Sequence, residues 1–129
     1  MKKTIVMLAV ILSAASCSKE KEYTQKLEGE WYVYKMLRNN IDVTNISPYR
    51  DTLRNYRITF SSGAFTECNQ FVGDTIPVCI GGTWTFENQF ETLTLTDSVY
   101  TSRSYTIFNL EGNHVELRRN GENRYFRKL

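Results

Sequence analysis

The side chains that could do chemistry in this chain of 129 residues are few, chiefly three cysteines and a single histidine. Cys68 and Cys79 have ten residues between them and fall on neighbouring predicted strands. In an oxidising compartment two such cysteines should form a disulfide, and free thiols are the alternative. A metal site would need two further ligands, and His114 is the only histidine. The pair therefore predicts a disulfide and no metal.

No arrangement of residues typical of an active site accompanies these cysteines. His114 follows Gly112-Asn113, where an exposed turn is expected. Glu28 and Glu30 alternate with a glycine at a strand start, which favours exposed carboxylates over an acid–base pair. The sequence has no nucleophile motif and no glycine-rich phosphate loop. We therefore predict that the protein is not an enzyme and holds no cofactor.

The third cysteine, Cys17, follows a segment with the features of a secretory signal. Two lysines precede an apolar run over residues 5–12, and small residues lead to the cysteine. The run is far shorter than the roughly 20 residues that span a bilayer, so no transmembrane helix is expected. Small residues directly before a cysteine resemble the lipobox of bacterial lipoproteins. The resemblance implies that residues 1–16 are a signal peptide and that Cys17 carries acyl chains such as palmitate.

The charge and the start of the mature chain indicate where the protein resides. The whole chain has 16 basic and 14 acidic side chains, and the signal holds two of the basic ones, so the mature chain is formally neutral. No basic patch argues for nucleic acid. Residues 17–26 are expected to be the lipidated cysteine and a solvated tether. Their Cys-Ser-Lys-acidic start resembles lipoproteins of the Bacteroidota, which implies a lipid-anchored protein of the bacterial outer membrane, on either its periplasmic or its surface face.

Residues 27–129 show the alternation of apolar and polar side chains that is typical of β-strands. Thr92–Thr96 is the clearest case, because Leu93 and Leu95 alternate with three threonines. The pattern predicts eight strands, over residues 31–37, 56–60, 63–71, 80–86, 92–96, 104–110, 114–118 and 123–128. Short turns such as Asn120-Gly121 join most of them and favour hairpins.

Consecutive hairpins predict an all-β domain in which neighbouring strands are antiparallel. Eight such strands can close into an up-and-down barrel, which removes exposed sheet edges, and a β-sandwich is the alternative. The one long connection, residues 39–55, contains Ser47-Pro48, which predicts an N-cap followed by a short helix over Pro48–Arg54.

Gly29-Glu30-Trp31 has the Gly-x-Trp form that opens lipocalins, and Gly82-Thr83-Trp84 repeats it. With the late Arg124–Lys128 stretch, the chain resembles lipocalin-like small lipoproteins of the Bacteroidota over residues 27–129. The resemblance implies a lipocalin-like barrel in which the opening tryptophan plugs one end. It also implies that an arginine of a late strand, either Arg124 or Arg127, stacks over that tryptophan.

The lipocalin resemblance implies a non-enzymatic protein that binds a small apolar or amphipathic ligand within the barrel. The candidate lining residues are Trp31, Val33, Tyr56, Ile58, Phe60, Trp84, Phe86, Leu93, Leu95, Val115 and Leu117. These side chains are bulky enough to fill a small barrel themselves, which is the alternative.

The second functional hypothesis is a protein-binding module of the cell envelope, such as an accessory subunit or an inhibitor of a secreted enzyme. Its sites would be the loops over residues 39–55 and 68–79. Separately, three Asp-Ser/Thr-apolar triplets resemble an O-glycosylation pattern of Bacteroides-like bacteria. They place candidate modification sites at Thr52, Thr75 and Ser98, and the alternative is that aspartate simply marks turns.

Overall fold

The computed structural model describes residues 19–70, 73–99 and 101–129 of the chain, so Cys17 and the signal over residues 1–16 lie outside the described residues. The described part begins with a helix over residues 19–27. The elements that follow are β1 (Gly29–Arg38), β2 (Ile41–Asp42), α2 (Tyr49–Arg54), β3 (Arg57–Ser61), β4 (Ala64–Asn69), β5 (Val78–Glu87), β6 (Thr92–Asp97), β7 (Ser102–Glu111), β8 (His114–Arg119) and β9 (Glu122–Lys128).

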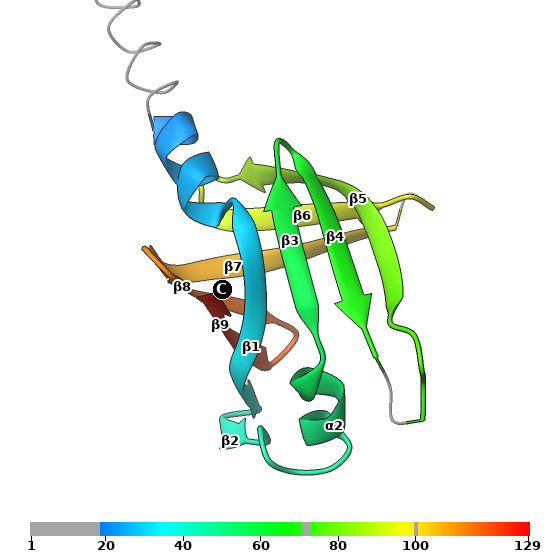
Figure 1. The fold of residues 1–129 in the computed structure, drawn as a ribbon. Helices are drawn as coiled ribbons and strands as arrows, with labels where there is room; N and C mark the ends of the chain where they lie inside the picture. Colours follow the sequence, from blue (N-terminus) through cyan, green and yellow to red (C-terminus); the bar gives the residue numbers. More distant parts are fainter. Residues whose placement is uncertain (1–18, 71–72, 100) are drawn as a thin grey trace, which may run out of the picture.

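The strands form one antiparallel sheet that closes on itself (Figure 1). From β3 to β9 each strand pairs with the next in sequence, and β1 pairs with both β3 and β9. The short β2 pairs only with β1, which leaves eight strands in the barrel. The predicted eight-stranded up-and-down barrel is confirmed, and the β-sandwich alternative is wrong.

The residues at a hairpin turn and at a close contact between two strands explain how this sequence forms a tightly closed barrel. Asn120 and Gly121, between β8 and β9, both have positive φ, at 50° and 74°, as a type I′ hairpin turn requires. Gly82 pairs with Asp97 of β6, and a β-carbon at position 82 would lie only 1.9 Å from the Thr96 carbonyl oxygen. Any other residue at position 82 would force these two strands apart.

A β-bulge in β1 changes which side chains face inward. The register against β9 shifts between Val33 and Lys35, so Tyr34 is the extra residue. Met36 therefore joins the buried core at 3% exposure, although strict alternation from Trp31 predicts that it faces outward with Tyr34.

The connections at the two ends differ from the sequence prediction in two respects. Residues 19–27 form a helix at one end of the barrel, where a solvated tether was predicted (Figure 1). At the opposite end α2 forms as predicted, but Pro48 rather than Ser47 is its N-cap residue. The Ser47 hydroxyl instead donates to the Asp51 carboxylate, at 3.3 Å.

The barrel interior is a single packed hydrophobic core. Ten of the eleven predicted lining residues are buried in it, and Phe86 packs against it while half-exposed. Trp31, Leu93 and Leu95 are 0–1% exposed. A side chain that lines a cavity large enough for water would keep accessible surface. These residues therefore fill the middle of the barrel instead of lining an open lumen.

Candidate functional site

Four arginines gather at the barrel end opposite the N-terminal helix. Each sits at the end of a strand, two residues from a core side chain on the same face, so the alternation of the strand aims it at the barrel opening. Arg38 follows Met36 on β1, Arg103 precedes Tyr105 on β7, Arg119 follows Leu117 on β8, and Arg124 precedes Phe126 on β9. With Tyr105, Asn120 and Glu122 they line a hollow of about 210 Å³. We call this hollow and its lining the arginine mouth.

A buried carboxylate, Glu67, anchors the inner side of the arginine mouth. It is 6% exposed and receives a hydrogen bond from the Tyr56 hydroxyl at 2.6 Å. Arg103 donates to both Glu67 oxygens, at 3.2 and 3.3 Å, and this is the bidentate geometry of a strong charge-assisted pair. Burial and the nearby Glu67 charge raise the pKa of Tyr56 well above its ordinary value. The tyrosine therefore remains a neutral donor to Glu67.

Arg124 is the second inner arginine. Its Nε donates to the Glu122 carboxylate, and its guanidinium lies 5.5 Å from the centre of the Tyr56 ring. Burial lowers the pKa of Arg124, but the neighbouring Tyr56 and Glu122 outweigh it and raise that pKa above its ordinary value. Arg124 is thus a permanent positive charge at the inner wall of the mouth.

The outer arginines, Arg38 and Arg119, are exposed at the rim. Arg38 donates to the Tyr49 hydroxyl at 2.7 Å, and Arg119 lies 5.9 Å from the centre of the Tyr105 ring. Both stand opposite Glu122 in the strand register, one on each side of it. Neither has a carboxylate within salt-bridge distance among the described residues. The charges of Arg38 and Arg119 are therefore not neutralised by ion pairs within this part of the chain.

An apolar hollow adjoins the arginine mouth beneath α2. It has a volume of about 220 Å³ and is lined mainly by Met36, Pro48, Tyr49, Thr52 and Leu53. The two hollows share the side chains of Glu122 and Arg124. A charged surface and an apolar surface thus meet at one barrel end, which is the arrangement that would hold an amphipathic molecule.

The other end of the barrel, which we call the tryptophan end, is closed by packing. Trp31 is fully buried, and its Nε1 donates to the Leu27 carbonyl at 2.7 Å. The Lys128 ammonium lies 4.9 Å from the centre of the Trp31 ring and donates to the carbonyl of residue 26 at 2.9 Å. Gly29 leaves room for this lysine, because a β-carbon there would lie 3.2 Å from the Lys128 stem.

Lys128 therefore holds the place over the opening tryptophan that was predicted for an arginine. Arg124 points into the arginine mouth, while Arg127 lies on the outer face, 4.8 Å from the centre of the Tyr34 ring. The prediction that one of these arginines stacks on Trp31 is wrong. The contact itself, a cation over the tryptophan that plugs the barrel, is present with a different residue.

Comparison with known proteins agrees with this architecture. Residues 27–117 match the family of the lipocalin-like domain. The chain belongs to the lipocalin-like domain family. A lipocalin-like protein from Bacteroides uniformis has a similar structure, with a TM-score of 0.61 and 14% sequence identity over 81% of this chain and 99% of that one. An uncharacterised protein from Bacteroides eggerthii has a TM-score of 0.60 and 11% identity over 80% of this chain and 99% of that one. No curated protein matches the chain significantly.

The family is generally one of non-enzymatic binding proteins, and the lipocalin-like barrel supports a role of that kind. The described ranges contain no group of three or more His, Cys, Asp or Glu side chains that could hold a metal ion. Nor does this part of the chain contain a helix that is long and apolar enough to cross a membrane.

His114 forms a hydrogen bond with the Tyr34 hydroxyl at 3.1 Å, and Glu28 accepts one from the Ser62 amide at 3.2 Å.

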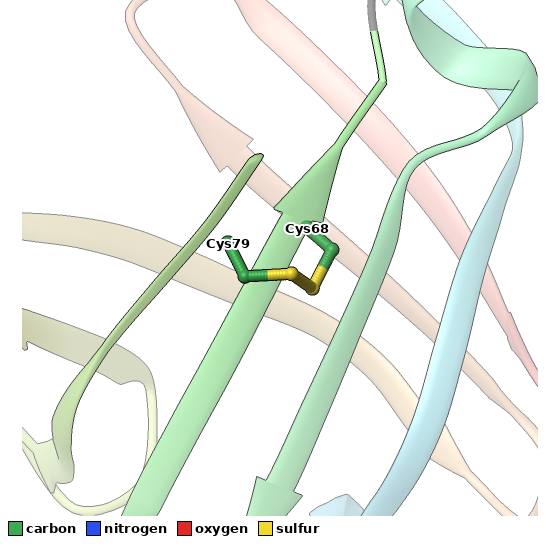
Figure 2. Close-up of a disulfide and its surroundings, with 2 residues drawn as sticks. All are labelled: Cys68 and Cys79. Atoms are coloured by element: carbon green, nitrogen blue, oxygen red, sulfur yellow. A yellow bond between two sulfur atoms is a disulfide. The ribbon is translucent and has the colours of Figure 1, made fainter. Parts of the chain in front are cut away.

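The predicted disulfide between Cys68 and Cys79 is confirmed (Figure 2). The two cysteines are register partners on β4 and β5, with their α-carbons 4.1 Å apart. Cys68 alternates with the inward-facing Glu67, so the bridge lies on the outer face of the lipocalin-like barrel. It closes the β4–β5 connection at the same barrel end as the arginine mouth.

A third hollow lies at the tryptophan end, between the N-terminal helix and the sheet. It has a volume of about 470 Å³ and is lined by Trp84, Phe86 and Phe90 together with helix residues. The indole Nε1 of Trp84 is buried and has no hydrogen-bond partner among the described residues. Tyr23 of the helix stacks on Phe90, with ring centres 4.8 Å apart, and covers part of this aromatic cluster.

The three candidate glycosylation sites differ in exposure. Thr75 and Ser98 are exposed, in the connections that follow β4 and β6 at the same barrel end as the arginine mouth. Thr52 is half-buried in α2, and its hydroxyl donates to the Pro48 carbonyl at 3.1 Å. Thr75 and Ser98 are therefore more accessible to a modifying enzyme than Thr52, and modification itself stays a prediction.

Sequence reasoning missed the arginine mouth and Glu67. Arg38 gave no signal in the sequence, since it faces inward only because of the bulge at Tyr34. A signal was nevertheless present for the other charged residues, because each occupies the inward-facing position of an alternating strand. Glu67, for example, is two residues from the core residue Phe65. A charge at such a position needs a partner or a ligand.

Proposed function

We propose that this chain is a non-enzymatic binding protein of the bacterial cell envelope that takes a small amphipathic molecule at the arginine mouth. The observation that carries the proposal is the pair of adjoining hollows, one lined by arginines and one by apolar side chains, that share Arg124 and Glu122. Because the middle of the barrel is packed, the ligand would sit at the opening and not deep inside.

The predicted lipid anchor fits this arrangement. Cys17 lies two positions before residue 19, the first described residue of the N-terminal helix, and that helix lies at the tryptophan end (Figure 1). An acylated Cys17 in the outer membrane would hold the tryptophan end toward the bilayer. The arginine mouth would then face away from the membrane and be open to soluble ligands.

Native mass spectrometry of the full chain after incubation with a bacterial envelope extract tests this proposal. A bound ligand should appear as a stoichiometric added mass of a few hundred daltons. Thr52→Trp would fill the apolar hollow and remove the added mass, whereas Thr59→Trp, on the exposed face of β3, would keep it. An unliganded mass, or an added mass that survives Thr52→Trp, would contradict binding at this site.

A second candidate function, recognition of a protein partner, is favoured by exposed aliphatic side chains around the same opening. Ile41 and Ile46 lie in the connection between β1 and α2, and Ile76 and Val78 lie beside the disulfide-closed connection. All four are 50–73% exposed. A partner-binding module should lose its partner when Ile76 and Val78 are changed to serine, while the amphipathic ligand would still bind.

A further inference from the structure

We infer that the ligand of the arginine mouth is an amphipathic acid, whose carboxylate binds between Arg38, Arg119 and Arg124 and whose apolar body lies beneath α2. The inference rests on the proposed function and names the chemical class of its ligand. Two observations support it, namely the excess of positive charge at the arginine mouth and the arginine hydrogen-bond donors that have no partner among the described residues.

The charges at the mouth do not balance. Four guanidinium groups face two carboxylates, Glu122 within the mouth and Glu67 behind it. Glu67 is bound on both of its oxygens by Arg103, and Glu122 is bound by Arg124. Two arginines, Arg38 and Arg119, therefore have no ion-pair partner among the described residues, and this local excess of positive charge attracts anions and repels cations.

The unused hydrogen-bond donors point to a planar anion. A guanidinium carries five donors in a rigid fork that matches a carboxylate in a bidentate manner. Among the described residues the Arg119 guanidinium has no side-chain hydrogen bond and lies 5.9 Å from the centre of the Tyr105 ring, while Arg38 donates one hydrogen bond to the Tyr49 hydroxyl. Because both flank Glu122 in the register, their forks stand on two sides of the same hollow. A carboxylate between them would form charge-assisted hydrogen bonds, which are about twice as strong as neutral ones.

The apolar hollow determines the chemistry of the second half of the ligand. Apart from Glu122 and Arg124, which it shares with the arginine mouth, its lining carries no charged side chain and includes Met36, Pro48 and Leu53. An inorganic anion would fill only the charged half. A short acid such as octanoate would place its carboxylate among the arginines and remove its alkyl chain from water, and each buried CH₂ would add to the affinity.

Calorimetric titration of the full chain with sodium octanoate, octan-1-ol and octylamine tests the charge requirement. We expect octanoate to bind at least tenfold more tightly than the alcohol, because each charge-assisted hydrogen bond contributes about 1.5–3 kcal/mol. The amine should not bind. An alcohol that binds as tightly as octanoate would overturn the inference and leave the proposed amphipathic site standing. If neither binds, the proposed function fails as well.

Substitutions test whether octanoate binds at the arginine mouth. Arg119→Ala should weaken octanoate binding roughly tenfold or more and leave alcohol binding unchanged. Arg119→Lys should recover part of the loss, because it restores the charge without the fork. The matched control is Arg127→Ala, which removes the same charge from the outer face of β9. The inference is overturned if Arg127→Ala weakens binding as much as Arg119→Ala does.

Because Arg119 is exposed and has no ion pair within the described residues, its removal should leave the urea midpoint of unfolding almost unchanged. Urea unfolding of the variant measures this change. A binding loss in a folded, equally stable variant cannot be attributed to misfolding.

Discussion

The two ends of this barrel use the same strands for opposite purposes. At the tryptophan end, Trp31 is fully buried, its indole nitrogen is hydrogen-bonded, and Lys128 covers its ring. At the arginine mouth, charged side chains occupy the inward-facing positions and two of them lack ion-pair partners among the described residues. The tryptophan end is thus built for stability, whereas the mouth keeps charge that packing alone would not favour.

The energetics of buried charge explain why this difference points to function. A buried ion pair such as Glu67–Arg103 is often no more stabilising than well-packed apolar residues of similar volume. The mouth therefore gains little stability from its charges, although breaking the pair would be costly. The ligand site proposed above would give these charges a role that stability alone does not.

The largest effect is expected at the tryptophan end. Trp31→Ala removes a fully buried indole and should lower the free energy of unfolding by about 3–5 kcal/mol, because the cavity it leaves collapses only partly. Urea unfolding measures the change. Tyr32→Ala, next in sequence but half-buried on the outer face, is the control and should cost clearly less. Equal losses would show that the tryptophan does not define this end.

A smaller effect is expected from Glu67 at the arginine mouth. Glu67→Ala leaves Arg103 without its carboxylate and Tyr56 without its acceptor, and it should cost about 3 kcal/mol of stability. Glu116→Ala is a matched control, since Glu116 is equally buried but its partner Arg118 is 44% exposed, against 22% for Arg103. Urea unfolding should show a smaller loss for Glu116→Ala, and the reverse order would contradict an enclosed network at the mouth.

The smallest effect concerns the Tyr56 hydroxyl. Tyr56→Phe should cost about 1.5–2 kcal/mol at neutral pH, because the hydroxyl donates to a charged acceptor. The folded pKa of Tyr56 is raised above its ordinary value of 10.0, so above pH 10 the unfolded chain loses this proton while the folded chain keeps it. Stability should therefore fall as pH rises through that range, by up to about 1.4 kcal/mol per pH unit from this group.

Unfolding curves between pH 8 and 11 test the sign of this dependence. The Tyr56→Phe variant should lose stability less steeply than the unsubstituted chain, since one of the protons responsible is gone. Tyr125→Phe, on the outer face of β9, reports how much any missing tyrosine changes the slope. Parallel curves for the chain and Tyr56→Phe would contradict a tyrosine that stays protonated inside the mouth.

The local sequence determined much of the fold. Alternation such as that of Leu93 and Leu95 among threonines is a property of one strand and survives in any tertiary setting, so the eight strands were predictable. The Asn120-Gly121 turn prescribes its own hairpin. The disulfide was also predictable from local sequence, because a connection between neighbouring strands brings Cys68 beside Cys79. The short charged segment over residues 19–27 carried no such pattern, and its helix was missed.

Which side chains meet at the two ends of the barrel depended on its closure, and the sequence alone did not predict it. The bulge at Tyr34 sets how β1 meets β9, and this register places Lys128 opposite Trp31 and Arg124 opposite Met36. The arginines of the mouth are up to 86 positions apart in the chain, from Arg38 to Arg124, and come together because β1 pairs with β9. Sequence alone determined most of the residues that each strand turns inward, and the exceptions are Met36 and Arg38, which follow the bulge in β1. Closure determined which of them meet, because contact between distant strands depends on register across the whole sheet.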